Sequence, residues 1–313
     1  RELEAMIEVN RGSETPTLVG FNFIGEPTRK RLKKRLLDGE FGALESLRFH
    51  AYWPRPASYY TRSAWAGTLL LDGRPVLDSC IGNALAHYVH NMLFWAGTDV
   101  ASFASVRDVR AQLYRAHRID SFDTAFVAAR IGPAGIPLRI VGCHACRGKQ
   151  DHLEVVECSR AVLRFHTRRG YRIHWKDGRA EETGPIEPLD GTLVMHNYRN
   201  RFQSLLNPRA RPYTTLPDCR PFVHLIDLAF LSAGRITAVD AAYREEHVDG
   251  DRYTLEIAGI RDAGRRFLEQ GLFPETSRFP WAAAESPGTK SPEDLETFTI
   301  DWIAARTPAP PAR

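Results

Sequence analysis

The chain has 313 residues, of which 43% are hydrophobic and 26% charged, a composition that excludes a disordered protein and predicts one large or two ordinary domains. Its net charge of +4 is small and dispersed, so no nucleic-acid partner is expected. The sequence has no run of about 18 apolar residues and no basic-then-apolar leader, which predicts no membrane partner and a cytoplasmic protein. Five cysteines, an odd number, favour reduced thiols over disulfides.

The first residues look like the end of another structural unit. RELEAMIEVNRG (1–12) has a helical pattern, and TLVGFNF (17–23) is typical of a short buried strand. The chain begins with Arg and enters this helix at once. We therefore expect a sequence that is entered partway through, with something N-terminal to it missing.

A strongly basic helix comes next. TRKRLKKRLLDG (28–39) follows Pro27 and ends at Gly39, as helices do. We expect Leu32, Leu36 and Leu37 to pack and the six basic residues to form an ordinary solvated face. Phosphate contact by these cations is the less favoured alternative.

The middle of the chain predicts a sheet. From Leu47 the sequence alternates apolar and polar residues up to Trp53, the pattern of a strand with one buried face. Five more segments are short, rich in β-branched and aromatic residues and separated by turn formers: 122–131, 136–145, 152–158, 161–167 and 171–179. Such a meander predicts mainly antiparallel pairing.

Helical patterns return after residue 195. They are expected at 196–206, from Thr215 to Gly234, near 257–270 and at 291–304, and a Pro-rich tail at 305–313 is expected to be disordered. Together the elements predict an α+β fold, with a large, open, mostly antiparallel sheet and helices packed on one face.

The segment NALAHYVHNMLFWAG (83–97) carries the first candidate site. On a helix Asn83, His87 and His90 would share one stripe, opposite an apolar one. A polar face made of imidazole without Lys, Glu or Arg favours the wall of a cleft. Two histidines bonded to neighbouring groups in the core are an equally supported alternative.

Two further stretches are candidates for a ligand-binding loop and for a metal site. In YWPRPASYYTRSAWAG (52–67), aromatic residues alternate with arginines, which favours a loop that binds a polyhydroxylated or acidic ligand, with packing as the equal alternative. The CxxC formed by Cys143 and Cys146 lies in an expected strand, where residues three apart point to opposite faces. We therefore predict no metal site, although His144, His152 and Cys158 keep a metal protein as a third interpretation.

Several segments, taken in order, resemble the C-terminal half of the glucose-fructose oxidoreductase, inositol dehydrogenase and MocA family. They are TLVGFNF, LLDGEFGALESLRFHAYWPR, YYTRSAWAG, VLDSCIGNALAHYVHNMLFWAG, the run from 196 to 234, and LEQGLFPETSRFPWA (268–282). The resemblance implies a remnant of a Rossmann domain at 1–24, a substrate and oligomerisation domain at 25–304, and the tail at 305–313. It also implies NAD or NADP as cofactor, a hydroxylated small-molecule substrate and homo-oligomers formed through the sheet.

The resemblance also implies roles for particular residues. The family's helix bears an Asp and a His four residues apart, and these positions match Asn83 and His87, so the carboxylate is replaced by an amide. We expect His87 to be the acid/base group, Asn83 and His90 to orient or hydrogen-bond the substrate, and Asp78, Tyr60 and Arg62 to contact the substrate.

The cofactor domain itself is not recognisable in the chain. The family's Gly-rich loop and its Glu-Lys-Pro segment are both missing, and no GxGxxG follows a strand. We therefore expect the substrate-binding part of a NAD(P)-dependent oxidoreductase acting on a sugar or polyol, inactive by itself. The rival hypothesis is a non-catalytic, sheet-based binding or assembly module that has lost cofactor binding.

Overall fold

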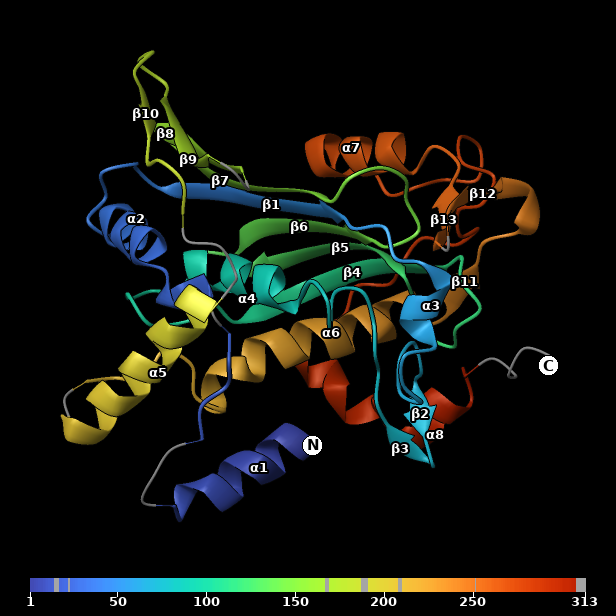
Figure 1. Cartoon of the computed structure of the whole chain (residues 1–313), viewed down its shortest axis with the longest axis horizontal. Helices are drawn as coiled ribbons and strands as arrows, with labels where there is room; N and C mark the ends of the chain where they lie inside the picture. Colours follow the sequence, from blue (N-terminus) through green and yellow to red (C-terminus); the bar gives the residue numbers. More distant parts are fainter. Residues whose placement is uncertain are drawn as a thin grey trace.

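The computed structural model describes residues 1–13, 17–21, 23–166, 169–186, 191–207, 210–250 and 252–307. Its centre is a nine-stranded sheet in the order β10-β9-β8-β7-β1-β6-β5-β4-β11 (Figure 1). The strands are β1 (Leu44–Tyr52), β4 (Val106–Arg115), β5 (Thr124–Ile131), β6 (Ile136–Cys143), β7 (Asp151–Cys158), β8 (Ala161–His166), β9 (Gly170–Trp175), β10 (Ala180–Glu182) and β11 (Ile236–Ala238).

The sheet is mostly antiparallel, as expected. Two neighbouring pairs, β1 with β6 and β4 with β11, are parallel, and the other pairs are antiparallel. The meander is therefore split, because β1 is inserted between β6 and β7, which are consecutive in the chain. Two small hairpins, β2 (Leu70–Leu71) with β3 (Arg74–Pro75) and β12 (Arg244–Asp249) with β13 (Arg252–Ile257), lie outside it.

Most helices cover one face of the sheet. α2 (Pro27–Leu37), α4 (Ala86–Trp95) and α6 (Arg220–Ala233) pack there on the alternate inward residues of the strands, among them Leu47 and Phe49, which have no exposed surface (Figure 1). The remaining elements are α1 (Glu2–Arg11), η1 (Phe23–Gly25), α3 (Ala57–Tyr60), α5 (Gly191–Leu206), η2 (Pro217–Cys219), η3 (Ala241–Tyr243), η4 (Pro292–Thr297) and α8 (Ile300–Ala304).

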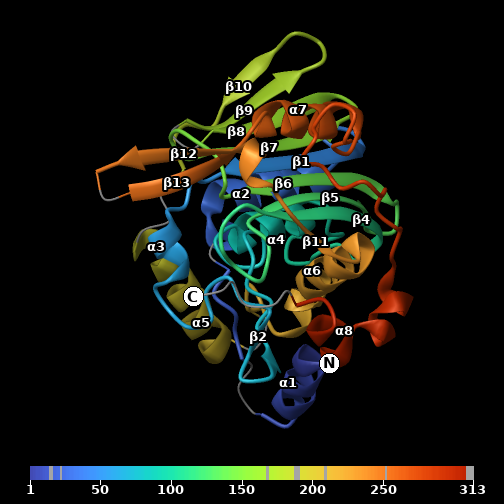
Figure 2. The same cartoon turned by 90° about the vertical axis from the view of Figure 1, so that its right-hand side faces the viewer.

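The second face of the sheet is partly covered. α7 (Ile260–Gln270) and the β12–β13 hairpin pack against it through a smaller core that contains Phe126, Val141, Phe267 and Trp281 (Figure 2). The α+β class and the large sheet are thus confirmed, with one helix added on the face expected to be open. No helix among the described residues has the length and apolar character that crossing a bilayer requires.

One local prediction was wrong, and two strand elements were not predicted. Residues 17–21 and 23 form no strand but a single bridge, between Leu18 and Thr215, followed by η1. β4 was missed because a bulge between Arg107 and Arg110, with Asp108 at a positive φ of 51°, interrupts its alternation. The β12–β13 hairpin was missed because its residues are mostly polar.

The basic helix also differs from the prediction. Arg29 and Lys33 lie on the buried side of α2, with 1% and 0% of their surface exposed, whereas Leu37 is 39% exposed. Arg29 makes an ion pair with the buried Glu154 at 3.1 Å, because only a paired charge is tolerated in the core. The solvated-face interpretation was therefore wrong for these two cations.

The C-terminal tail falls largely outside the described residues, which end at Thr307. Within the described part, the side chain of Arg306 donates a hydrogen bond to the carbonyl oxygen of Gly234 at 2.9 Å. The start of the expected tail is thus attached to the end of α6.

Candidate functional site

The turn that precedes α4 holds Asp78 and Asn83 together. The Asn83 side-chain amide donates to Asp78 Oδ1 at 2.8 Å, and the backbone N–H of Gly67 donates to Asp78 Oδ2 at 2.6 Å. The Asn83 N–H also donates to the carbonyl of Ser79, which sets the turn before the helix begins at Ala86. Asp78 is 8% exposed, so this carboxylate is compensated by directed donors inside the fold.

His87 lies in the first turn of α4, one turn after Asn83. Its ring centroid is 5.6 Å from those of both Phe21 and Phe23, which come from the N-terminal segment. It is the one residue of this helix that is not buried. Burial against these rings nevertheless lowers the pKa of His87, so its imidazole is neutral at neutral pH and able to accept a proton.

His90 lies in the core and not on the wall of a cleft. It has no exposed surface and stacks on Phe21, with ring centroids 3.8 Å apart, and beside Phe103 at 4.1 Å. Burial lowers its pKa to about 3. The interpretation of the polar stripe as a cleft wall was therefore wrong at this position, because the N-terminal segment and α6 cover it.

Tyr60 is the last residue of α3, and Arg62 follows two residues later. Tyr60 lines a cavity of about 540 Å³, together with Gly67, His117 and residues of the β12–β13 hairpin. Burial raises the pKa of Tyr60 well above its usual value, so it stays a neutral hydroxyl. Arg62 is exposed, and its guanidinium stacks 3.7 Å from the ring centroid of Tyr59.

Next to Tyr60 the structure shows a buried polar cluster that the sequence analysis did not find. His117 Nδ1 lies 2.7 Å from Asp123 Oδ2, and His117 Nε2 lies 3.1 Å from the carbonyl oxygen of Arg55. The Tyr60 hydroxyl lies 3.0 Å from His144 Nδ1. These residues come from three separate strands and loops, so no spacing in the sequence could have revealed the cluster.

Hydrogen bonds stabilise the ionised form of the Asp123 carboxyl. Burial raises the pKa of its carboxyl, but bonds from the His117 ring and from the backbone amides of Ala116 and His117 outweigh it, and the pKa lies below the usual value. His117, Tyr60 and Gly67 all line the same cavity. Because Gly67 also donates to Asp78, the cavity wall is linked directly to the Asp78–Asn83 pair.

The two cysteines of the CxxC lie at the end of β6 and just after it. Cys146 Sγ donates to the carbonyl oxygen of Cys143 at 3.4 Å, and both side chains are buried. His144 is engaged with Tyr60, while His152 stacks on Phe165. Within the described ranges, the three ligand-type groups that come together are Glu245, His247 and Glu256, on the β12–β13 hairpin.

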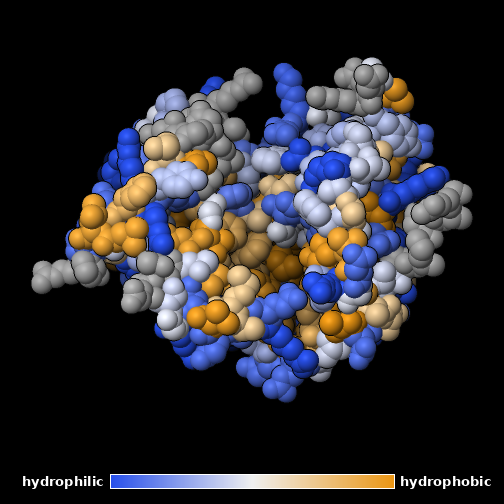
Figure 3. Space-filling model, turned by 60° about the horizontal axis from the view of Figure 1, so that its bottom comes forward, coloured by the Kyte–Doolittle hydropathy of each residue, from blue (hydrophilic) through white to orange (hydrophobic). Residues whose placement is uncertain are grey.

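Apolar side chains are exposed on the face that contains α1 and α5. Figure 3, which brings this face forward, shows a hollow lined by apolar atoms and a second apolar area at the left, over α5. The exposed apolar residues of α5 recur at helical spacing and include Met195, Tyr198, Phe202 and Leu206. A contiguous exposed apolar area of this kind is typical of a surface that another domain or chain covers.

Comparison with known proteins identifies the fold. No family model matches the sequence, and no curated protein does. The WlbA dehydrogenase from Bordetella pertussis, solved with NADH and UDP-GlcNAcA, is 20% identical with a TM-score of 0.56 over 74% of this chain and 65% of that one. Levoglucosan dehydrogenase, solved with NADH, is 16% identical with a TM-score of 0.59 over 74% and 68%.

The similar structures are not all named as enzymes. A super-repressor mutant of Gal80p from Saccharomyces cerevisiae is 11% identical with a TM-score of 0.57, over 74% of this chain and 66% of that one. The chain therefore shares its fold with these proteins, and the predicted resemblance is confirmed at the level of the fold. The chain spans about two thirds of the length of these proteins.

Proposed function

We propose that this chain is the substrate side of a nicotinamide-dependent oxidoreductase that acts on a sugar or a related hydroxylated compound. The observation that supports this most is the position of His87: a neutral imidazole, the one residue of α4 that is not buried, on a fold shared with dehydrogenases solved with NADH. Because fold alone does not imply function, the proposal depends on this side chain and its neighbours.

The sequence has no GxGxxG fingerprint of the kind that holds dinucleotide phosphates, so we assign the phosphates of the cofactor to no residue of this chain. In a dehydrogenase the cofactor accepts the hydride. The part that we assign to this chain is to accept the proton of the substrate hydroxyl at His87 and to bind the substrate. Asn83 is oriented by Asp78 so that its carbonyl oxygen stays available as an acceptor, and Tyr60 and Arg62 are the proposed outer contacts.

His90 is not included among these roles, because its ring is enclosed by Phe21 and Phe103.

We also propose that copies of the chain associate through the sheet. The second face of the sheet, which α7 and the β12–β13 hairpin cover only in part, carries charged side chains. One of them is Arg48, which is ion-paired with Glu157 at 2.8 Å. An interface there would be polar and would weaken with salt.

The test uses the complete gene product, assayed for NAD⁺ or NADP⁺ reduction with a panel of sugars, polyols and nucleotide sugars. We expect His87→Ala to lower kcat/KM by about 10²-fold or more, because a positioned general base contributes that much. The acidic limb of the kcat/KM profile should lie below the ~6.5 of a free imidazole and disappear in the variant.

The control is His174→Ala, an exposed histidine on β9 that should leave kcat/KM unchanged. An equal activity of His87→Ala and the unchanged protein would remove His87 from the mechanism.

The second candidate function is a non-catalytic regulatory or binding module. It is favoured by Asn83 in place of the family's Asp and by the presence of a repressor among the similar structures. The same assay separates the two: a complete gene product that reduces neither NAD⁺ nor NADP⁺ with any compound of the panel supports the module.

A further inference from the structure

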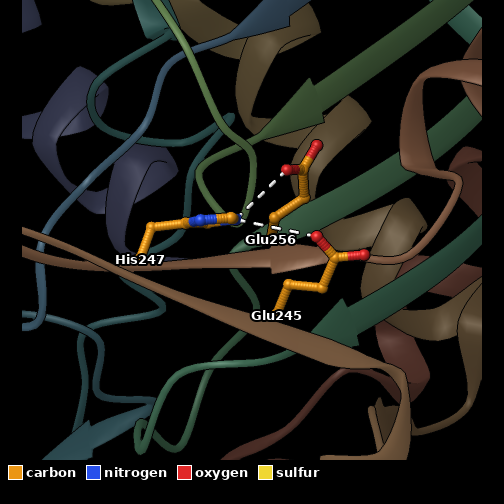
Figure 4. Close-up of side chains that lie close together, drawn as sticks. All are labelled: Glu245, His247 and Glu256. Atoms are coloured by element: carbon orange, nitrogen blue, oxygen red, sulfur yellow. Dashed lines mark ion pairs between the residues drawn. The ribbon is translucent and has the colours of Figure 1, made fainter.

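The β12–β13 hairpin places three metal-binding side chains on one of its faces. Glu245 and Glu256 are direct cross-strand partners in the antiparallel register. His247, two residues further along β12, pairs with Thr254. Because side chains alternate along a strand, Glu245 and His247 point to the same side of β12, and the cross-strand partner Glu256 joins them there. Figure 4 shows the three side chains converging.

His247 Nε2 is buried beside both carboxylates but makes no hydrogen bond to any of the described residues. It lies 3.4 Å from a carboxylate oxygen of Glu256 and 3.8 Å from one of Glu245. Two donor atoms that each lie about 2.1 Å from a tetrahedral ion are about 3.4 Å apart. The spacing therefore matches ligands arranged around one ion.

Electrostatics also favour a cation at this position. Two carboxylates directly opposite each other in a strand pair repel. Among the described residues, neither Glu245 nor Glu256 has a Lys or Arg within ion-pair distance, and the imidazole of His247 is the one basic group close to each of them. A bound cation would balance the two carboxylates.

We propose that Glu245, His247 and Glu256 bind a divalent transition-metal ion of the zinc class, through His247 Nε2 and one oxygen of each glutamate. One imidazole with two carboxylates suits Zn²⁺ better than Mg²⁺ or Ca²⁺, which prefer oxygen ligands alone. Side-chain exposure of 61% at Glu245, against 25% and 20% at His247 and Glu256, leaves one side of the ion open to water.

The ion would join β12 to β13 at the wall of the large cavity. Glu246, Tyr253 and Leu255, on the opposite face of the hairpin, line the cavity of about 540 Å³ that Tyr60 and His117 also line. A bridge between Pro56 and Thr254 attaches the hairpin to the segment before α3. Binding therefore stiffens one wall of the cavity without placing the metal inside it, which makes this proposal independent of the role of His87.

The test is equilibrium dialysis of the protein against ZnCl₂ at neutral pH, followed by metal analysis. We expect about one retained zinc per chain, and its loss in both His247→Gln and Glu256→Gln, because three ligands are the least that hold the ion. Retention should also fall below about pH 6, where protons compete for the imidazole. MgCl₂ at the same concentration should not displace the zinc.

Two variants serve as matched controls. His174→Gln removes an exposed histidine elsewhere in the sheet, and Glu246→Gln removes a carboxylate from the opposite face of the same hairpin. Both should retain zinc as the unchanged protein does. Added zinc should raise Tm in the unchanged protein and not in Glu256→Gln.

The proposal is overturned if the unchanged protein retains no zinc, because the three side chains then lie together without binding a metal. It is equally overturned if His247→Gln retains as much zinc as the unchanged protein, since the metal then lies elsewhere, for instance on cysteines.

Discussion

At the scale of single residues, Asn83 stands where the family has an aspartate, and the carboxylate of Asp78 lies next to its side chain. Asp78 accepts from Asn83 and from the Gly67 backbone, so a negative charge is present in the turn even though position 83 has none. The substitution Asn83→Asp, which restores the family's aspartate, would place two carboxylates at hydrogen-bond distance. They would repel each other, or one of them would have to be protonated.

We therefore predict that Asn83→Asp lowers the free energy of unfolding by about 1–3 kcal/mol, because it removes a donor and adds a like charge beside the buried Asp78. The double variant Asp78→Asn with Asn83→Asp should regain most of that loss. In it an amide at 78 can accept from Gly67 and donate to a carboxylate at 83. Urea unfolding of the four proteins in a double-mutant cycle measures the coupling.

A coupling energy near zero in that cycle would show that Asp78 and Asn83 do not depend on each other. The two carbonyl-bearing side chains would then be oriented independently, and the argument that Asp78 positions Asn83 would fail.

At the scale of elements, α4 is held in place at its end by a side chain from α2. The Lys33 Nζ donates to the carbonyl oxygens of Trp95, at 2.9 Å, and of Gly97, both at the C-terminal end of α4. The last carbonyls of a helix have no partners within it and carry a partial negative charge, which a buried ammonium group satisfies. This contact explains why a lysine with no exposed surface is tolerated in the core.

Lys33→Met should therefore lower the free energy of unfolding by about 1–3 kcal/mol, because it leaves buried carbonyls without a donor while nearly preserving side-chain volume. The matched control is Lys34→Met, the next residue on the same helix. Lys34 is 67% exposed and pairs only with Asp38, so its loss should cost about 0–0.5 kcal/mol. Urea unfolding of both variants gives the comparison, and equal effects would contradict the capping role.

At the scale of the whole molecule, two buried histidines make the fold sensitive to acid. His90 and His144 are 0% and 1% exposed, and burial lowers the pKa of each to about 3. The native state keeps them neutral, whereas the unfolded chain protonates them near pH 6.5. Their contribution to stability is therefore complete above about pH 6.5 and is lost as the pH falls below it.

Each of these histidines should lower the free energy of unfolding by up to about 1.4 kcal/mol per pH unit between about pH 6 and 4. Asp227 works in the opposite direction, because burial raises its pKa to about 7 and the native state then binds the extra proton. Asp227 therefore offsets part of the loss of stability that the two histidines cause on acidification.

We predict that His90→Phe, which keeps an aromatic ring against Phe21 and Phe103, reduces this slope by about 1.4 kcal/mol per pH unit. His174→Gln, at an exposed position, should leave the slope unchanged. Urea unfolding at a series of pH values measures it. A His90→Phe slope as steep as that of the unchanged protein would mean that His90 is protonated in the native state.

The sequence by itself determined the class of the fold and most of its strands. Alternation at β1 and the turn formers between β5 and β9 are local signals, because side-chain period and turn chemistry depend on residues close together in the chain. The same holds for the end of α2 at Gly39, whose φ of 76° suits glycine. The resemblance carried by residues 76–97 then pointed to the fold that the comparisons identify.

What only the tertiary structure decided is which polar side chains meet and which are covered. His90 and His87 share one face of α4, yet the first is enclosed by Phe21 and Phe103 while the second is only partly covered. The hydroxyl of Tyr60 meets His144, which is 84 residues further along the chain, because α3 packs beside the end of β6. Burial and long-range pairing arise from the packing of elements distant in the chain, so no local pattern in the sequence encodes them.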